Sequence, residues 1–210
     1  QVMMLVQMTV VYHTAVKYGG AAQIALMGAS QRVMQLAFVP IWGMSQGLQP
    51  AVGTNYGAKN YLRVKQLVNI FIMGATTLAV VFFAIIELFP RQILSAFITE
   101  SGTVESGISL YRLMFSAFAT YGLLIMTLTY LQALGRAKLA GLLEVCRQLA
   151  LVIPMVLLLP ILMRGNVLGV WLALPLNDVI ILIIAVTMLL REHKLLKEMS
   201  KGAGVENYSS

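Results

Sequence analysis

Charged residues are scarce in this sequence. Only 11% of its 210 residues are Asp, Glu, Lys or Arg, whereas 59% are hydrophobic. An ordinary soluble domain carries about 25% charged residues, so this composition excludes a soluble globular domain and indicates an integral membrane protein. The net charge of +7 comes from basic residues placed between apolar stretches. Such a placement follows membrane topology, and we therefore expect no nucleic-acid partner.

Cysteine and the common catalytic motifs are also nearly absent. The only cysteine is Cys146, in an apolar segment. It excludes a disulfide within the chain and leaves a redox or metal role without partner residues. No His-Glu-x-x-His, no phosphate-binding loop, no paired-cysteine motif and no usable Ser-His-Asp set occurs. We predict that the protein is not an enzyme and has no metal site.

Long apolar stretches are what the sequence does contain. Bounded by Gly, Pro and charge, they predict six membrane spans at about 1–17, 22–54, 66–90, 108–131, 139–163 and 166–190. The predicted fold is an all-α, six-helix transmembrane bundle over residues 1–200, followed by a flexible tail at 201–210. The first span offers only about 24 Å of helix before Lys17, against a bilayer core of about 30 Å. We therefore expect the chain to be a fragment whose missing portion lies N-terminal.

Proline and loop charge add shape and orientation. The second span is too long to cross upright and contains Pro40, so we expect a kink or tilt. One set of loops holds nine basic residues: Lys59, Arg63, Lys65, Arg136, Lys138, Arg191, Lys194, Lys197 and Lys201. The opposite loops hold three: Lys17, Arg91 and Arg164. This asymmetry predicts a plasma (inner) membrane protein with a cytoplasmic C-terminus. The external segment 91–107 is long enough for a short interfacial helix.

A stripe of polar residues runs along the second span. Gln31, Gln35, Trp42, Gln46 and Gln49 are spaced 4, 7, 4 and 3 residues apart, which confines them to a face roughly 60° wide. Four amides are unfavourable against lipid, so this face meets other helices or a wet cavity. Two interpretations remain open. The amides hold helices together, or they form one wall of a substrate cleft for a cationic or aromatic compound.

An acidic residue lies in the middle of the sixth span. Asp178 at that depth costs about 3 kcal/mol on insertion scales, which makes it a candidate for ion coupling or for a buried ion pair. The fifth span supplies Glu144, Arg147 and Gln148 on one helical face. Arg147 reaches Asp178 if these two spans pack antiparallel, as their short connection favours. Trp171 shares the face of Asp178, seven residues earlier.

The first span adds two polar candidates for the cleft. Gln7 shares one face with Thr14, and His13 shares another with Thr9 and Lys17. No second metal-type ligand accompanies His13, so we expect a wet or hydrogen-bonded imidazole that can take up a proton during transport, rather than a metal ligand.

Three segments resemble one transporter family. Residues 38–65, with Pro-Ile-Trp-Gly-Met-Ser-Gln-Gly-Leu-Gln-Pro-Ala-Val-Gly-Thr-Asn-Tyr-Gly near their centre, are similar to the hallmark segment of multidrug and toxic compound extrusion (MATE) transporters. Residues 130–138 resemble the family's loop between its tenth and eleventh helices. Arg147-Gln148 followed by Ile153-Pro154 resembles the start of the eleventh helix. The resemblance covers about residues 1–200.

The resemblance implies the C-terminal lobe of a twelve-helix, pseudo-symmetric transporter whose partner is an N-terminal six-helix lobe. Such a protein exports amphipathic, often cationic, small organic compounds across the lipid membrane in exchange for H+ or Na+, by alternating access and with no other cofactor. NorM-like members use acids of the seventh and tenth helices for the cation, but spans 1–17 and 108–131 here contain no Asp or Glu. The chain is therefore closer to the DinF-like branch, in which coupling is attributed to an aspartate of the first helix.

Two alternatives to a drug:cation antiporter stay open at this point. A lipid-linked glycan flippase of the same superfamily predicts a strongly cationic cleft for pyrophosphate, whereas the stripe of the second span is neutral. A non-transport membrane scaffold predicts that Gln35, Gln46 and Asp178 are all packed dry between helices.

Overall fold

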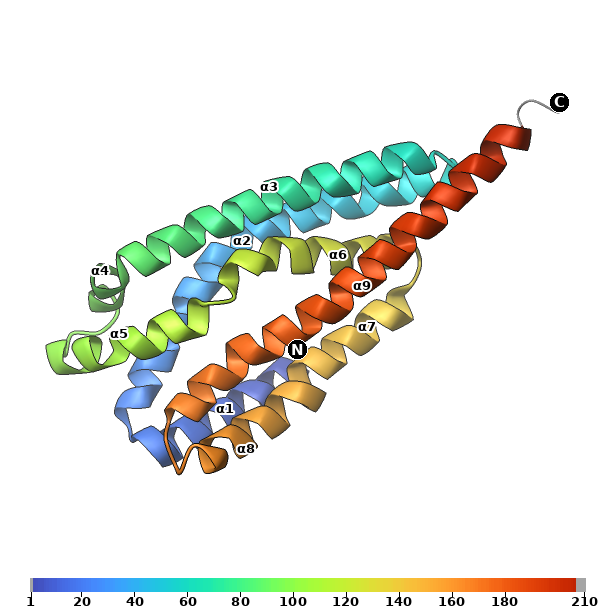
Figure 1. Cartoon of the computed structure of the whole chain (residues 1–210). Coiled ribbons are helices and arrows are strands. Elements are labelled where there is room, and N and C mark those ends of the chain that lie inside the picture. Colours follow the sequence, from blue (N-terminus) through green and yellow to red (C-terminus); the bar gives the residue numbers. More distant parts are fainter. Residues whose placement is uncertain (1, 207–210) are drawn as a thin grey trace.

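The fold is an elongated bundle of helices (Figure 1). The computed structural model describes residues 2–206, with side chains up to residue 199. Within this part there is no β-strand, which confirms the predicted all-α class. Five of its helical segments are long and apolar enough to cross a membrane: Ala22–Gly57, Tyr61–Leu88, Ser101–Ala133, Ala137–Leu162 and Leu168–Met199.

The helices follow the predicted spans closely, with two spans divided into shorter pieces. The elements are α1 (Val2–Gly19), α2 (Ala22–Gly57), α3 (Tyr61–Leu88), α4 (Pro90–Ser95), α5 (Ser101–Phe115), η1 (Phe118–Thr120), α6 (Tyr121–Ala133), α7 (Ala137–Val145), the π-helical η2 (Cys146–Leu151), α8 (Val152–Leu162) and α9 (Leu168–Glu206). Helix α1, over the predicted span 1–17, is not among the five segments above. Helix α4 lies where a short interfacial helix was predicted. Helix α9 continues through 201–206, the start of the predicted tail, and residues 1 and 207–210 lie outside the described part.

Helix α2 is longer than a membrane is thick. Its 36 residues correspond to about 54 Å of helix, and it contains Pro40 and Pro50. Figure 1 shows it changing direction along its length before it runs beside α3. The helix continues past the predicted end at 54, and backbone donors of the following turn satisfy its last carbonyls: Ala58 N donates to Thr54 O at 3.0 Å, and Asn60 N donates to Asn55 O at 2.9 Å. Lys59 then turns the chain in a left-handed conformation, with φ of 57°.

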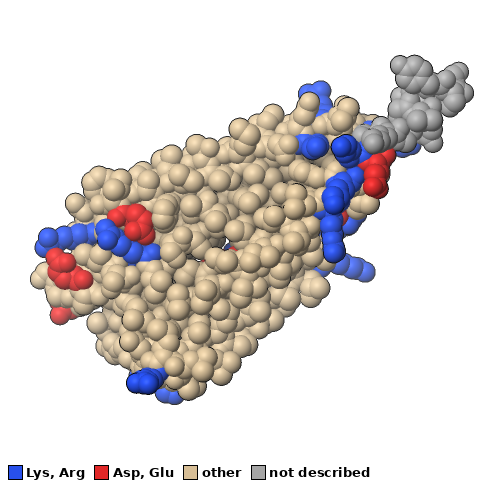
Figure 2. Space-filling model, in the orientation of Figure 1, with Lys and Arg blue, Asp and Glu red and all other residues tan. Residues whose placement is uncertain are grey.

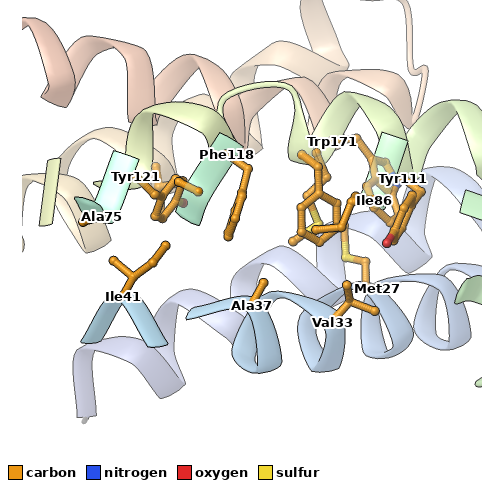
Figure 3. Close-up of a cluster of buried hydrophobic side chains, with 14 of the residues drawn as sticks. Met27, Val33, Ala37, Ile41, Ala75, Ile86, Tyr111, Phe118, Tyr121 and Trp171 are labelled. Carbon is orange, nitrogen blue, oxygen red and sulfur yellow. The ribbon is translucent and has the colours of Figure 1, made fainter. Parts of the chain in front are cut away.

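The predicted span 108–131 is broken in the middle. Helix α5 ends at Phe115, and α6 begins only at Tyr121, after a turn and the short η1. A series of aromatic ring contacts crosses the break between α5 and α6. The centroid distances are 4.8 Å for Tyr111–Phe115, 5.8 Å for Phe115–Phe118 and 5.3 Å for Phe118–Tyr121. All four side chains belong to the buried core, and Figure 3 labels Tyr111, Phe118 and Tyr121 among them. The core therefore fixes where Tyr121 stands at the start of α6.

Two glycines allow helices to come unusually close. A Cβ at Gly122 would overlap the backbone of Ala75 and Thr76, so α6 lies directly against α3 only because this residue is glycine. A Cβ at Gly169 would lie 2.5 Å from Pro160 N, so the start of α9 can pack against the end of α8 only because this residue is glycine. Helices α8 and α9 are antiparallel neighbours.

The outer surface matches a membrane environment. Large apolar side chains are exposed along the helices, including Met73 at 70%, Leu36 at 66% and Ile70 at 63%. Figure 2 shows charged side chains gathered at the two ends of the bundle, with the long side between them almost free of charge. Lipid tails cover such a surface without the cost that water would impose.

Candidate functional site

The candidate site is a cavity of about 430 Å³ inside the bundle. Its wall comes mainly from α1, α2, η2 and α9, and Met114 of α5, Tyr121 of α6 and Val152 of α8 complete it. Glutamine amides, one indole and one ion pair supply most of its polar groups. A cavity of this size and mixed chemistry is typical of a site for a small organic molecule.

Part of the predicted polar stripe lines the cavity. Gln31, Gln35 and Trp42 of α2 are in its wall, and Gln7 of α1 joins them. Gln35 is exposed, and the Trp42 side chain is 59% exposed. These side chains are therefore not packed dry between helices, so the cavity-wall interpretation keeps its basis.

Three predicted cleft residues lie elsewhere. Gln46 and Gln49 are exposed and outside the cavity wall. They share the face of Trp42 but lie about 6 and 10 Å farther along α2, beyond the end of the cavity. His13 is also exposed and outside the wall, because six residues from Gln7 correspond to a rotation of about 240° around α1. The structure thus separates these three residues from the cavity.

A buried ion pair lies at the wall of the cavity. Arg147 Nη1 is 3.7 Å from Asp178 Oδ1, and the two side chains are 19% and 11% exposed. The antiparallel packing of α8 and α9 brings them together, as the short connection between the two spans predicts. Asp178 is the only acid among the described cavity residues and Arg147 the only base.

Glu144 extends this pair into a cluster of three charges. Its Oε1 is 3.8 Å from Arg147 Nε, although Glu144 itself is not in the cavity wall. The same oxygen accepts a 2.5 Å hydrogen bond from Gln148 Nε2. Two carboxyl groups thus share one guanidinium.

Tyr121 completes the cluster and was not predicted from the sequence. Its hydroxyl donates a 2.6 Å hydrogen bond to Asp178 Oδ2. Its ring lies 5.8 Å from the Arg147 guanidinium and, edge to face, 5.8 Å from the ring of Phe38. The residue therefore links α2, α6, η2 and α9 at one point. The signal that could have found it is the Ser116–Thr120 interruption of an apolar run, which marks a helix start just before it.

The backbone beside Arg147 is irregular for a physical reason. Pro154 has no N–H to donate to the carbonyl of Ala150, so a regular α-helical hydrogen bond is missing at that point. The chain forms the π-helical η2 immediately before it. Single π-helical turns of this kind are frequent at functional sites.

Trp171 and Asn177 also belong to the surroundings of the cluster. Trp171 is fully buried, and its Nε1 donates to Gln23 Oε1 at 2.9 Å, so this indole fastens α9 to α2. Asn177 is buried in the cavity wall, and its Oδ1 has no hydrogen-bond partner among the described atoms. No three His, Cys, Asp or Glu side chains of the described part come together in a way that could hold a metal ion.

A bundle of membrane-length helices around an amide-lined cavity with a buried ion pair defines an integral membrane protein with an internal polar site. Residues 1–158 match the profile of the MatE family, and the chain belongs to this family. Members of the family are transporters, not enzymes, and work without a cofactor.

Known relatives agree with this assignment. The chain is 25% identical over 158 residues to a protein of Shewanella oneidensis named FAD transporter, covering 75% of this chain and 34% of that protein. Among solved structures, a multidrug resistance MATE family transporter in the outward-facing conformation superposes with a TM-score of 0.85 at 22% identity, over 94% of this chain and 44% of that one. A MATE transporter in a bent conformation gives a TM-score of 0.87 at 21% identity, over 96% and 44%. The chain thus spans about a third of the curated relative and under half of the solved structures.

Proposed function

We propose that this chain forms the C-terminal lobe of a secondary active antiporter that exports small amphipathic, aromatic and often cationic compounds. The observation that carries the proposal is the cavity, where the amides of Gln7, Gln31 and Gln35 and the exposed indole of Trp42 lie beside the Arg147–Asp178 pair. Neutral amides and an aromatic face bind a planar guest with little cost from fixed charge.

The rest of the lining supports a site that accepts more than one guest. Met4, Met8 and Met34 contribute flexible thioethers to the wall. Methionine adapts its shape readily, and surfaces rich in it bind varied partners. This composition favours broad substrate acceptance over tight shape selection.

The proposed arrangement in the membrane rests on loop charge and on the family's two-lobed organisation. The side with nine basic residues faces the cytoplasm of a plasma (inner) membrane protein, and an N-terminal six-helix lobe forms the second wall of the cleft. Rocking of the two lobes then exposes the cavity alternately to each side. The chain is assigned to the DinF-like branch as part of the same proposal.

Asp178 is the proposed coupling residue of this lobe, with H+ or Na+ as the ion. It is buried within a membrane-length helix, and it is the only carboxylic acid among the described cavity residues. Exchange of a proton or a sodium ion at this carboxylate changes the charge of the cavity during each cycle. In the complete transporter, Asp178→Asn should lower proton-linked efflux, and efflux that stays unchanged across the pH range would contradict the assignment.

The cavity itself is tested by Trp42→Ala in the complete transporter. Removing the indole should raise the KM for efflux of a fluorescent aromatic cation about tenfold, because an aromatic contact with a cation is worth up to about 2 kcal/mol. Leu36→Ala is the matched control, because Leu36 is exposed on the same helix but lies outside the cavity wall. A KM that rises equally in both variants would contradict the cavity as the substrate site.

Export of a flavin nucleotide is a second candidate function. The relative named FAD transporter favours it, and so does the combination of an exposed indole with Arg147 in one wall. Competition between FAD and the aromatic cation for efflux distinguishes the candidates. A lipid-linked glycan flippase is disfavoured because Arg147, paired with Asp178, is the only cationic residue among the described lining residues.

A further inference from the structure

Arg147 lies between two carboxyl groups and is firmly bonded to neither. Its Nη1 is 3.7 Å from Asp178 Oδ1, and its Nε is 3.8 Å from Glu144 Oε1. Charge-assisted hydrogen bonds between such groups are normally about 2.7–2.9 Å long. Nη1 is buried and makes no hydrogen bond to any described atom. The guanidinium therefore lies between the two carboxyl groups without a close ion pair to either, and it also lies 5.8 Å from the ring of Tyr121.

Each carboxyl group has a neutral donor of its own. Tyr121 donates to Asp178 Oδ2 at 2.6 Å, and Gln148 donates to Glu144 Oε1 at 2.5 Å. Either acid can thus lose Arg147 and still keep one hydrogen bond, which lowers the cost of moving the guanidinium from one to the other.

The backbone that carries Arg147 is suited to such a movement. Arg147 and Gln148 are both in the π-helical η2, where both residues are partly buried. Pro154 leaves the carbonyl of Ala150 without an α-helical donor. Because the extra residue of a π-helical turn can shift along a helix as hydrogen bonds exchange, a side chain in it can rotate without unfolding of the flanking helices.

We propose that Arg147 is an internal counter-ion that pairs with Asp178 when no transported cation is bound, and transfers to Glu144 when Asp178 takes up a proton or a monovalent cation. The inference rests on the proposed coupling role of Asp178 and extends it to the residue that positions the charge. With Arg147 on Asp178, the cluster of two carboxylates and one guanidinium carries one net negative charge. With a proton on Asp178 and Arg147 on Glu144, it is neutral.

Few charged or titratable groups surround Asp178 in the described part of the chain. Arg147 from η2, Tyr121 from α6 and Glu144 from α7 are the titratable or charged groups around it in the described part of the chain. The side chains that α1 and α2 contribute to the cavity wall are uncharged. Arg147 is therefore the group that can compensate a change in the charge of Asp178.

A double-mutant cycle in the complete transporter tests the transfer through the pH at half-maximal efflux. Glu144→Gln removes the alternative ion-pair partner of Arg147, so Arg147 stays paired with Asp178. Half-maximal efflux should then require an about tenfold higher proton concentration. In the Arg147→Gln background, Glu144→Gln should change the required proton concentration less than twofold. A direct effect of the Glu144 charge on Asp178, without transfer of Arg147, would give the same shift in both backgrounds and would overturn the proposal.

Infrared difference spectroscopy gives a second readout that does not need Arg147→Gln to fold. The carboxylate band of Glu144, identified by its loss in Glu144→Gln, should shift on acidification of the unmodified transporter. In Asp178→Asn it should no longer respond to pH, because Arg147 then stays on Glu144. A Glu144 band that ignores pH in the unmodified protein overturns the proposal.

The two proposals fail in different ways. If Asp178→Asn leaves the pH dependence of efflux intact, the coupling role of Asp178 is wrong. If Asp178→Asn abolishes that dependence but Glu144→Gln acts equally in both backgrounds, only the transfer of Arg147 is wrong.

Discussion

Helix α9 carries two buried acids, and each has an arginine partner. Glu192 pairs closely with Arg136 from the turn between α6 and α7, and that arginine is 43% exposed. Asp178 pairs loosely with Arg147 across 3.7 Å, and that arginine is 19% exposed. The first pair lies outside the cavity, whereas the second forms part of its wall.

This difference assigns a structural role to Glu192 and leaves Asp178 as the candidate for ion coupling. The close pair of Glu192 and Arg136 reaches the surface and joins α9 to the turn between α6 and α7 without a ligand. A long ion pair with a separate tyrosine donor can exchange its partner for a proton or a cation. Under the proposed function, the two carboxylate–guanidinium pairs have different uses because their distances and surroundings differ.

The largest effect that separates the two pairs is expected on stability. Arg147→Ala leaves a carboxylate uncompensated in the bundle, which costs about 3–5 kcal/mol of unfolding free energy when Asp178 is ionised. Arg136→Ala should cost about 1 kcal/mol, because water replaces a half-exposed arginine. Thermal unfolding of the purified transporter measures both.

The loss in Arg147→Ala should also shrink as the pH falls, because Asp178 then takes up a proton and no longer needs a counter-ion. Equal losses in the two variants, independent of pH, would show that the two pairs do not differ.

An intermediate effect is expected from the tyrosine that only one of the acids has. Tyr121→Phe removes the 2.6 Å hydrogen bond to Asp178, and a hydrogen bond to a charged group contributes about 1.5–3 kcal/mol. The anion is then less stable, so the pH profile of efflux should move to higher pH. Tyr111→Phe is the control, because its hydroxyl is buried without a hydrogen-bond partner in the described part of the protein. A similar shift in the control would remove the special role of Tyr121.

The smallest effect is expected within the glutamine stripe. Gln35→Ala removes an amide from the cavity wall and should raise the KM for efflux about threefold, in line with one neutral hydrogen bond. Gln49→Ala changes the same residue type on the same helix face, outside the wall, and should leave KM unchanged. If both variants raise KM alike, the cavity extends farther along α2 than the structure indicates.

Much of the fold could be predicted from the sequence because long apolar runs leave few alternatives. Glycine, proline and loop charge divide the chain into spans, and the short connection near Asn166 makes the last two antiparallel. The meeting of Arg147 and Asp178 follows from that arrangement. The family resemblance, carried mainly by residues 38–65, is confirmed by the match over residues 1–158.

The rest depended on backbone irregularities that apolar periodicity does not reveal. The break before Tyr121 is marked only by Ser116 and Thr120 within a mostly apolar run, so the span reads as continuous. Pro154 signals a disturbance but not its π-helical form. Trp171 shares a face with Asp178, yet it lies about 10 Å away along the helix and is bonded to Gln23. Whether a residue reaches the cavity depends on its position along the helix axis as well as on the helix face that it occupies.

The most direct test compares the two acids of α9 in one assay. Efflux of an aromatic cation is measured against external pH in the complete transporter carrying Asp178→Asn or Glu192→Gln, two substitutions that each remove one buried negative charge. The account predicts that Asp178→Asn abolishes the pH dependence and lowers efflux at least tenfold, whereas Glu192→Gln keeps the normal profile within about twofold. A normal profile in Asp178→Asn, or an equal loss in both variants, would contradict it.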